Sequence, residues 1–212
     1  MNFASPALTS LLSLRQEIAQ TIAGYIVHDL MSWQNARQKA AEDKGRLPAG
    51  AFPDSAEIES AVRETWAVFA PEAHAALLKK RRLAALSLMK NLFSGFDVSL
   101  AGAVLNGAAT PESNIRLELF TDDVKSAEVA LMDRGIDFDV LTTIDSRMPT
   151  PLEVLAFIDP ASDRNDPVGV LVEIHSTKHL GRNPCRREPD AWQAEWEASG
   201  RLDANELEKH LF

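Results

Sequence analysis

Cysteine is almost absent from this chain, because Cys185 is the only one among its 212 residues. A single cysteine excludes a disulfide within the chain and any metal site built from paired cysteines. This scarcity is typical of proteins from a reducing compartment. The thiol lies in the loop-like run Arg182–Arg187, so we interpret Cys185 as a structural residue and not as a nucleophile.

Long apolar runs are missing as well. No stretch approaches the ~18–20 apolar residues that a membrane span needs. The chain also does not open with a positive charge followed by an apolar segment, as a secretory signal does. We therefore expect a cytoplasmic protein with no membrane association. Glycine-rich phosphate loops of the Walker or dinucleotide type are absent too.

Positive charge is in deficit: 22 Lys and Arg residues face 31 Asp and Glu residues, which gives a formal net charge of −9. This balance argues against a protein that coats DNA or RNA, because such a protein needs a large positive field. It leaves room for a small basic pocket that binds one phosphate group. The tail holds a spread basic set that could serve in this way, although its first interpretation is solvated surface: Lys178, Arg182, Arg186 and Arg187.

The first half of the sequence has the pattern of regular helices. Hydrophobic residues make up 45% of the chain, which is ordinary for a folded globular protein. Apolar residues recur every three or four positions from Leu8 to Ile26, and this spacing predicts a helix. Ser32 and Gly45 are typical cap residues, so we expect a second helix over residues 32–44.

Two more helices are predicted after a turn-rich connector at residues 45–53. The third should begin at Asp54, because Glu57 three residues later completes a capping box. Pro71 should open the fourth at its first position, where proline is tolerated. Gly95 should end this fourth helix.

After Asp97 the pattern changes to that of a sheet. Residues 98–105 read as an apolar strand that stops at Asn106-Gly107, and residues 114–119 alternate like a strand with one buried face. Asp122 and Asp123 are expected at the start of a short helix, where they complement the helix dipole. Further strands are predicted over residues 136–144, 152–158 and 168–175.

The tail is expected to return to helix. Pro189 should open a helix that carries Trp192 and Trp196, and Asp203 should cap a last helix. The sequence thus predicts an α+β fold, in which a helical N-terminal part precedes a mixed sheet flanked by helices. We divide it into a helical region at residues 1–95, a sheet core at 96–185, and C-terminal helices at 186–212 that pack on the core.

The run Gly102–Leu117 resembles the signature of the nucleotidyltransferase superfamily. That signature is an apolar strand, a Gly-Ser turn, a short spacer and an Asp-x-Asp pair on the next strand. The resemblance is to small bacterial nucleotidyltransferase-like proteins with a helical N-terminal half. It is carried by residues 106–109 within this run and by three further runs: residues 36–41, 54–58 and 119–125. It implies a nucleotidyltransferase-like sheet and a nucleotide ligand, with Mg²⁺ as the cofactor of an active member.

This chain departs from the signature at each critical position. Ala108, after Gly107, takes the place of the serine, and Asn114 and Arg116 take the places of the paired aspartates. The third carboxylate maps onto Gly169. Arg116 is permanently cationic and would repel a metal, but its guanidinium can bind phosphate through two parallel hydrogen bonds. The positions assigned to nucleotide or phosphate binding are therefore Gly107, Ala108, Asn114, Arg116, Lys178 and Arg182, and none is assigned to a metal.

A displaced pair of carboxylates is the alternative to this loss. Glu118 shares a strand face with Arg116, and Glu173 shares the parity of Gly169, so the two would converge if their strands pair. They would then be the catalytic residues of a divergent transferase that uses Mg²⁺. The simpler interpretation is a solvent-facing carboxylate on each strand, paired with Arg116. His175 and His179 at the end of the last strand are further candidates for phosphate or metal contacts.

Three functions follow, in order of preference. The first is a nucleotide- or anion-binding regulatory protein on a retired nucleotidyltransferase fold, with little or no transferase activity. The second is an active divergent nucleotidyltransferase that uses Glu118 and Glu173. The third is a protein–protein adaptor in which the helical half, residues 8–69, binds a protein partner or a second copy of the chain.

Overall fold

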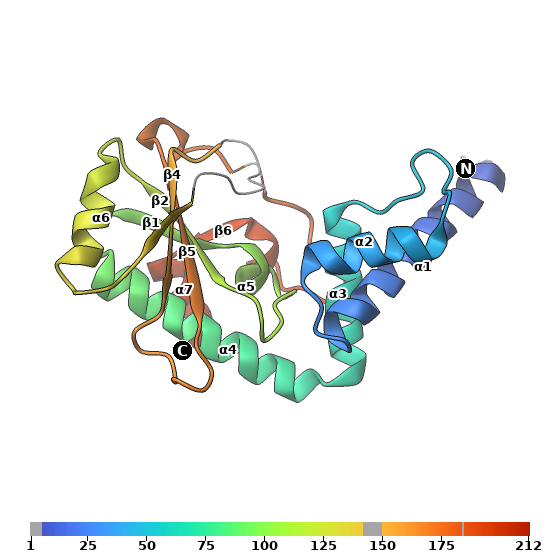
Figure 1. Cartoon of the computed structure of the whole chain (residues 1–212), viewed down its shortest axis with the longest axis horizontal. Helices are drawn as coiled ribbons and strands as arrows, with labels where there is room; N and C mark the ends of the chain where they lie inside the picture. The colour runs from blue at the N-terminus through green and yellow to red at the C-terminus, as the bar shows by residue number, and fades with distance from the viewer. Residues whose placement is uncertain (1–5, 142–149, 184) are drawn as a thin grey trace. The chain divides into compact units, whose positions relative to one another are not determined.

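The computed structural model describes residues 6–141, 150–183 and 185–212, and it has the α+β class that the sequence predicts (Figure 1). The chain forms two compact units. The first consists of Met1–Ala75 with Thr110–Glu112, and the second of Ala76–Ala109 with Ser113–Phe212. The division at Ala75 falls inside helix α4, Pro71–Ser87.

The first unit is built from three helices that the sequence predicts: α1 (Pro6–Val27), α2 (Trp33–Lys44) and α3 (Ser55–Phe69). Their ends follow from local chemistry. The Ser32 hydroxyl accepts a hydrogen bond from Asn35 N, 3.3 Å away, and caps α2. Asp54 and Glu57 form the predicted capping box, in which Glu57 Oε2 accepts from Asp54 N at 2.7 Å. Among the described helices, none is long and apolar enough to cross a bilayer.

The second unit contains a six-stranded sheet of order β3-β4-β5-β2-β1-β6. The strands are β1 (Asp97–Ala101), β2 (Ile115–Phe120), β3 (Asp139–Leu141), β4 (Glu153–Ile158), β5 (Gly169–His175) and β6 (Arg201–Asp203). The central pair β2 and β5 is parallel, and the other neighbours are antiparallel. The sheet is therefore mixed, as predicted.

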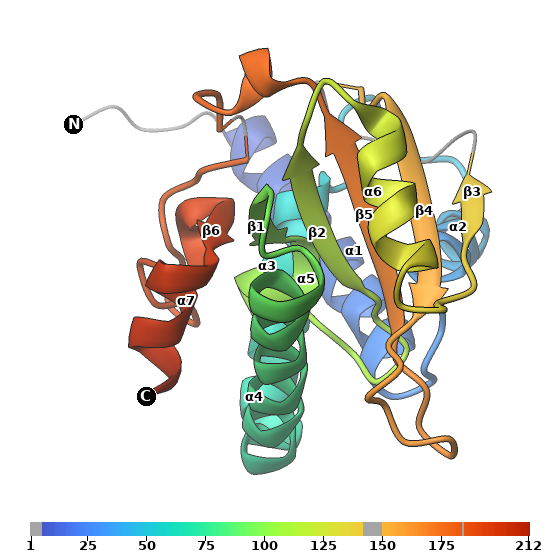
Figure 2. The same cartoon turned by 90° about the vertical axis from the view of Figure 1, so that its left-hand side faces the viewer.

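One face of this sheet forms the hydrophobic core of the second unit. Leu117 and Leu119 on β2, with Val172 and Ile174 on β5, have no exposed surface. They belong to one cluster with residues of α4, α6 (Val124–Met132) and α7 (Ala204–Leu211), and Figure 2 shows these helices along the sheet. Because strand side chains alternate between faces, the intervening residues of β2 and β5 all point to the opposite face.

The strand expected over residues 98–105 is wrong in its second half. β1 ends at Ala101, and residues Gly102–Asn106 form the short helix α5. Gly102 has φ +70°, a left-handed conformation that favours glycine and turns the chain out of the strand. Gly107, at φ +82°, ends α5 in the same way.

The helix expected to run from Pro189 is also wrong. The segment forms turns and the 3₁₀ helix η3 (Glu197–Ser199), followed by the unpredicted strand β6. Tertiary contacts determine this conformation, because the Arg82 guanidinium lies 4.5 Å from the Trp196 ring centre and 2.5 Å from Glu197 Oε1. The final helix is capped by Asp203, as predicted. Of the strand expected over residues 136–144, Asp139–Leu141 form β3, and residues 142–144 lie outside the described residues.

Arg82 is buried and holds the tail against α5. Its Nε and Nη2 donate to Val104 O and Leu105 O at 2.9 and 3.0 Å, in addition to the ion pair with Glu197. Replacing Arg82 by alanine should destabilise the second unit by about 3 kcal/mol, because Glu197 would keep a mostly buried charge without its partner. Urea unfolding followed by tryptophan fluorescence measures this loss.

The matched control is Arg134→Ala. The exposed Arg134 side chain makes one hydrogen bond, to Asn91 O at 3.0 Å, and its removal should change the free energy of unfolding by less than about 0.5 kcal/mol. Equal losses in the two variants would contradict the role given to Arg82.

Candidate functional site

The polar face of the sheet gathers charged side chains where β2 and β5 run side by side. In their parallel register Glu118 lies opposite Glu173, and Phe120 lies opposite His175. The two strands on which the displaced carboxylates were predicted do pair, so Glu118 and Glu173 come together. The apolar residues that flank each glutamate along its strand are buried in the core. Their burial fixes the face to which both carboxylates point.

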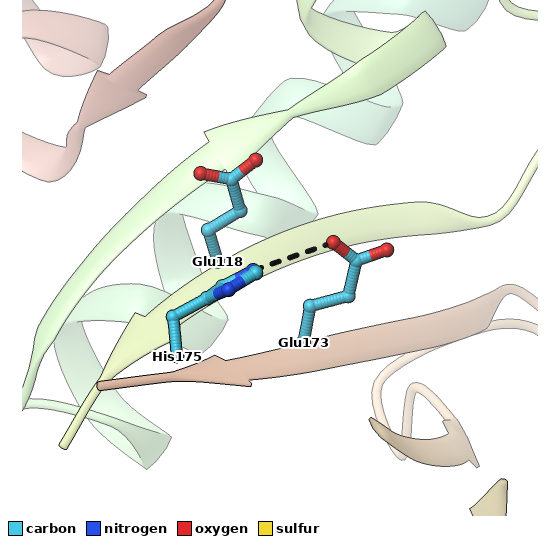
Figure 3. Close-up of side chains that lie close together, drawn as sticks. All are labelled: Glu118, Glu173 and His175. Atoms are coloured by element: carbon cyan, nitrogen blue, oxygen red, sulfur yellow. Dashed lines mark ion pairs between the residues drawn. The ribbon is translucent and has the colours of Figure 1, made fainter. Parts of the chain in front are cut away.

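Glu118, Glu173 and His175 form a compact set of ligand atoms, here called the Glu-Glu-His cluster (Figure 3). One oxygen of each carboxylate and one ring nitrogen all lie within 4.8 Å of one another. Glu173 and His175 are 1% and 4% exposed, and the Glu118 side chain is 14% exposed. His175 Nε2 is 3.6 Å from Glu173 Oε2. Two carboxylates and an imidazole are a donor set that binds divalent cations.

Two arginines balance the charge of this cluster. Arg116 Nη2 donates to Glu173 Oε2 at 2.6 Å, and Arg201 Nη1 lies 3.6 Å from Glu118 Oε2. Arg201 is held by its surroundings, because its guanidinium carbon is 4.6 Å from the Phe120 ring centre. The Phe120 ring in turn stacks on His175, with centroids 5.7 Å apart. Arg201 comes from β6, a strand that the sequence did not predict.

The electrostatics of Glu173 follow from these contacts. Burial disfavours its charged form, but the hydrogen bond from His175 and the charge and hydrogen bond of Arg116 outweigh burial. The net result is that the pKa of Glu173 is lowered below its ordinary value. The carboxylate is therefore charged at neutral pH and available to a cation.

Three buried atoms of this region make no hydrogen bond within the described structure: Glu173 Oε1, His175 Nδ1 and Arg116 Nε. A buried polar atom without a partner costs about 1–3 kcal/mol. Such atoms are uncommon in native proteins, and each calls for an explanation such as an ion, a water molecule or a catalytic role. Here the set combines a carboxylate oxygen and a ring nitrogen with an arginine donor.

The positions at which the nucleotidyltransferase resemblance would place its carboxylates do not suit a metal. The Asn114 side chain lies against Gly169, and a Cβ atom at Gly169 would overlap its Oδ1. Asn114 and Gly169 line a shallow pocket of about 350 Å³ with Asp137 and Asp139. No carboxylate stands at the three mapped positions, so the donors for a cation lie further along each strand: Glu118 is two residues beyond Arg116, and Glu173 is four residues beyond Gly169.

The predicted phosphate contacts at Gly107 and Ala108 have other roles. Gly107 ends α5, and Ala108 N donates to Asn106 Oδ1 at 3.0 Å. This N–H group is therefore not directed at a phosphate. The sequence placed the pair at the end of a strand, but it follows a helix, and the helix begins at Gly102.

Lys178 and Arg182 lie in the exposed segment that follows β5. Between them, His179 is partly buried, and its pKa is lowered by burial and by the charges of Lys178, Arg182 and His175. Lys178 and Arg182 follow the carboxyl end of β5, and this end of the strands is where open α/β sheets commonly bind ligands.

Asp122 has a role that the sequence did not indicate. It was expected to start α6, but its carboxylate accepts from Ser176 Oγ at 2.6 Å and from Thr177 N at 3.2 Å. Asp123 occupies the N-cap position of α6 without a side-chain capping bond. Asp122 therefore ties the end of β2 to the turn that carries Lys178. Its partners are 54 and 55 residues away, so no local pattern could reveal this.

Comparison with known proteins adds no assignment, because no protein-family model and no curated protein matches the chain.

The Arg116–Glu173 pair makes stability depend on pH. Glu173→Gln should lower the free energy of unfolding by about 3 kcal/mol at pH 7, because the glutamine leaves Arg116 charged and unpaired. A folded pKa below the unfolded value of about 4.3 means that the carboxylate stabilises the fold above that pH. The contribution is lost as pH falls through the lowered folded pKa, so the two proteins should converge in strongly acidic buffer. Urea unfolding across a pH series measures the difference, and a gap that stays constant with pH would contradict the charged pair.

Proposed function

We propose that this protein binds a divalent cation together with the phosphate of a nucleotide or a similar ligand, as a binding or regulatory protein on a nucleotidyltransferase-like fold. The observation that carries the proposal is the Glu-Glu-His cluster, in which three ligand atoms lie within 4.8 Å of one another. Glu173 supplies a buried oxygen that has no hydrogen-bond partner in the described structure.

The donor set indicates the kind of cation. Mg²⁺ and Ca²⁺ prefer oxygen ligands alone, whereas imidazole suits the transition metals. Two carboxylates with one histidine therefore favour Mn²⁺ or Zn²⁺ over the Mg²⁺ that the family resemblance implies. Three protein ligands leave coordination positions for water or for a ligand oxygen.

The surrounding positive charges suit a phosphate. Arg116 has an Nε donor without a partner in the described structure, and guanidinium binds phosphate through two hydrogen bonds. Lys178 and Arg182 are exposed at the end of β5 and can add long-range attraction. A cation would satisfy the unpartnered carboxylate oxygen, and a phosphate bound to that cation would satisfy the unpartnered arginine donor.

Binding without transfer is the favoured form of this function. Two-metal phosphoryl chemistry uses two ions about 3.5–4 Å apart, and the Glu-Glu-His cluster supplies ligands for one. Asn114 and Arg116 add no carboxylate to hold a second ion. The active divergent transferase and the helical adaptor, with a protein partner or a second copy, stay predictions.

The first experiment titrates Mn²⁺ into the full chain and reads free Mn²⁺ by electron paramagnetic resonance. We expect one ion per chain, and at least tenfold weaker binding in Glu173→Gln and Glu118→Gln, because each removes a charged ligand. Glu206→Gln is the matched control: its carboxylate lies on α7 and pairs with Lys209, so Mn²⁺ affinity should not change.

Wild-type chain that binds no Mn²⁺ at millimolar concentration, or Glu173→Gln chain with unchanged affinity, would refute the proposed site.

Incubation with α-labelled nucleoside triphosphates and Mn²⁺ tests turnover separately. We expect retention of nucleotide by the protein and no labelled product, and a transferred label would support the active enzyme instead.

A further inference from the structure

We propose that Arg116 is an internal counter-ion that couples the two ligands of the site. In the structure its guanidinium neutralises Glu173; on cation binding it leaves Glu173 and takes the phosphate. The inference rests on the proposed function and adds to it an order of events and a cooperativity between cation and phosphate.

A cation and Arg116 would compete for the single negative charge of Glu173. Glu173 Oε2 accepts from Arg116 Nη2 at 2.6 Å and also lies 3.6 Å from His175 Nε2. A cation held between Glu173 and His175 would lie within a few ångströms of the guanidinium. Like charges at such a distance in a poorly hydrated site repel strongly, so a cation on either oxygen of Glu173, the unpartnered Oε1 included, weakens the hold of Arg116 on this carboxylate.

Arg116 cannot relieve this repulsion by losing its proton. Guanidinium stays charged at any pH at which the protein is folded, whereas a buried lysine can deprotonate. The repulsion therefore favours a movement of the Arg116 side chain away from Glu173. The Arg116 side chain is 20% exposed, and its Nε has no hydrogen-bond partner within the described structure. The side chain is therefore neither fully buried nor held by a hydrogen bond at Nε.

Local structure restrains Arg116 less than Arg201. Arg116 packs over Gly102, where a Cβ atom would come within 3.3 Å of Arg116 Cδ. Glycine at this position, required also by its φ of +70°, keeps the stem of Arg116 uncrowded. Arg201 differs, because Phe120 lies against its guanidinium and its Nη2 donates to Leu180 O. Arg116 is therefore the mobile charge of the pair and Arg201 the fixed one.

The displaced guanidinium would bind the phosphate. A charge removed from its carboxylate needs a new anion, and a phosphate on the cation presents two oxygens to the Arg116 fork. The cation then makes room for phosphate binding, and the phosphate stabilises the displaced arginine. Thermodynamic linkage makes this effect reciprocal, so each ligand must raise the affinity of the chain for the other by the same factor.

The test compares Mn²⁺ binding to wild type and Arg116→Met, each with and without inorganic phosphate, by the same resonance titration on the full chain. Without phosphate, Arg116→Met should bind Mn²⁺ at least tenfold more tightly, because the competing charge is gone. Phosphate should tighten Mn²⁺ binding severalfold in wild type and have little effect in the variant. Arg134→Met is the matched control, with the same chemical change at an exposed site, and it should behave as wild type.

Arg116→Lys gives an independent test if the methionine variant does not fold. Lysine keeps a positive charge but lacks the bidentate fork, so the gain from phosphate should be smaller than in wild type. A lysine variant with the full wild-type gain would overturn the role of the guanidinium. Arg116→Met chain with unchanged or weaker Mn²⁺ affinity, or with the wild-type response to phosphate, would overturn the coupling while leaving the metal site in place. Absence of Mn²⁺ binding in wild type would instead refute the proposed function itself.

Discussion

The parallel pairing of β2 with β5 is the constraint on which the candidate site depends. Side chains alternate along both strands, so a shift of one residue would move Glu118 or Glu173 from the polar face into the core. The fully buried Leu117 and Ile174 prevent that shift, because exposing either would cost about 1.5–3 kcal/mol. The hydrophobic face therefore sets the geometry of the charged one, although no apolar residue belongs to the Glu-Glu-His cluster.

Stability alone is a poor explanation of this charged face. Taking two carboxylates and two arginines out of water costs several kcal/mol per ion, and apolar residues of similar size often stabilise a fold as well or better. A purely structural network would also be expected to satisfy its atoms, yet Glu173 Oε1 and Arg116 Nε make no hydrogen bond within the described structure. Both facts fit better with groups positioned to receive a ligand than with an ion-pair network that only stabilises the sheet.

Sequence patterns predicted what local chemistry determines. The caps at Ser32 and Asp54 involve residues within three positions of each other, and both are confirmed. Strand parity was enough to propose that Glu118 and Glu173 share a face, although their pairing needed the structure. The helix after Gly102 was missed because apolar residues suit a buried strand and a buried helix equally. Arg201 and the tail could not be foreseen, since partners more than twenty residues away fix them.

The residues at the positions mapped from the nucleotidyltransferase signature have physical roles in this sheet. Asn114 occupies the space beside Gly169, and Arg116 binds the carboxylate of Glu173, four residues beyond Gly169 on β5. The residues at these positions and the two glutamates thus form one arrangement, in which the carboxylates meet four residues, or about 13 Å, beyond the Asn114–Gly169 contact. The carboxylates therefore lie toward the carboxyl ends of β2 and β5, next to the turn that carries Lys178. A cation held by the Glu-Glu-His cluster would lie nearer to the basic residues that follow β5 than a cation beside Asn114 and Gly169, and Arg116 stands between these two positions in the strand register.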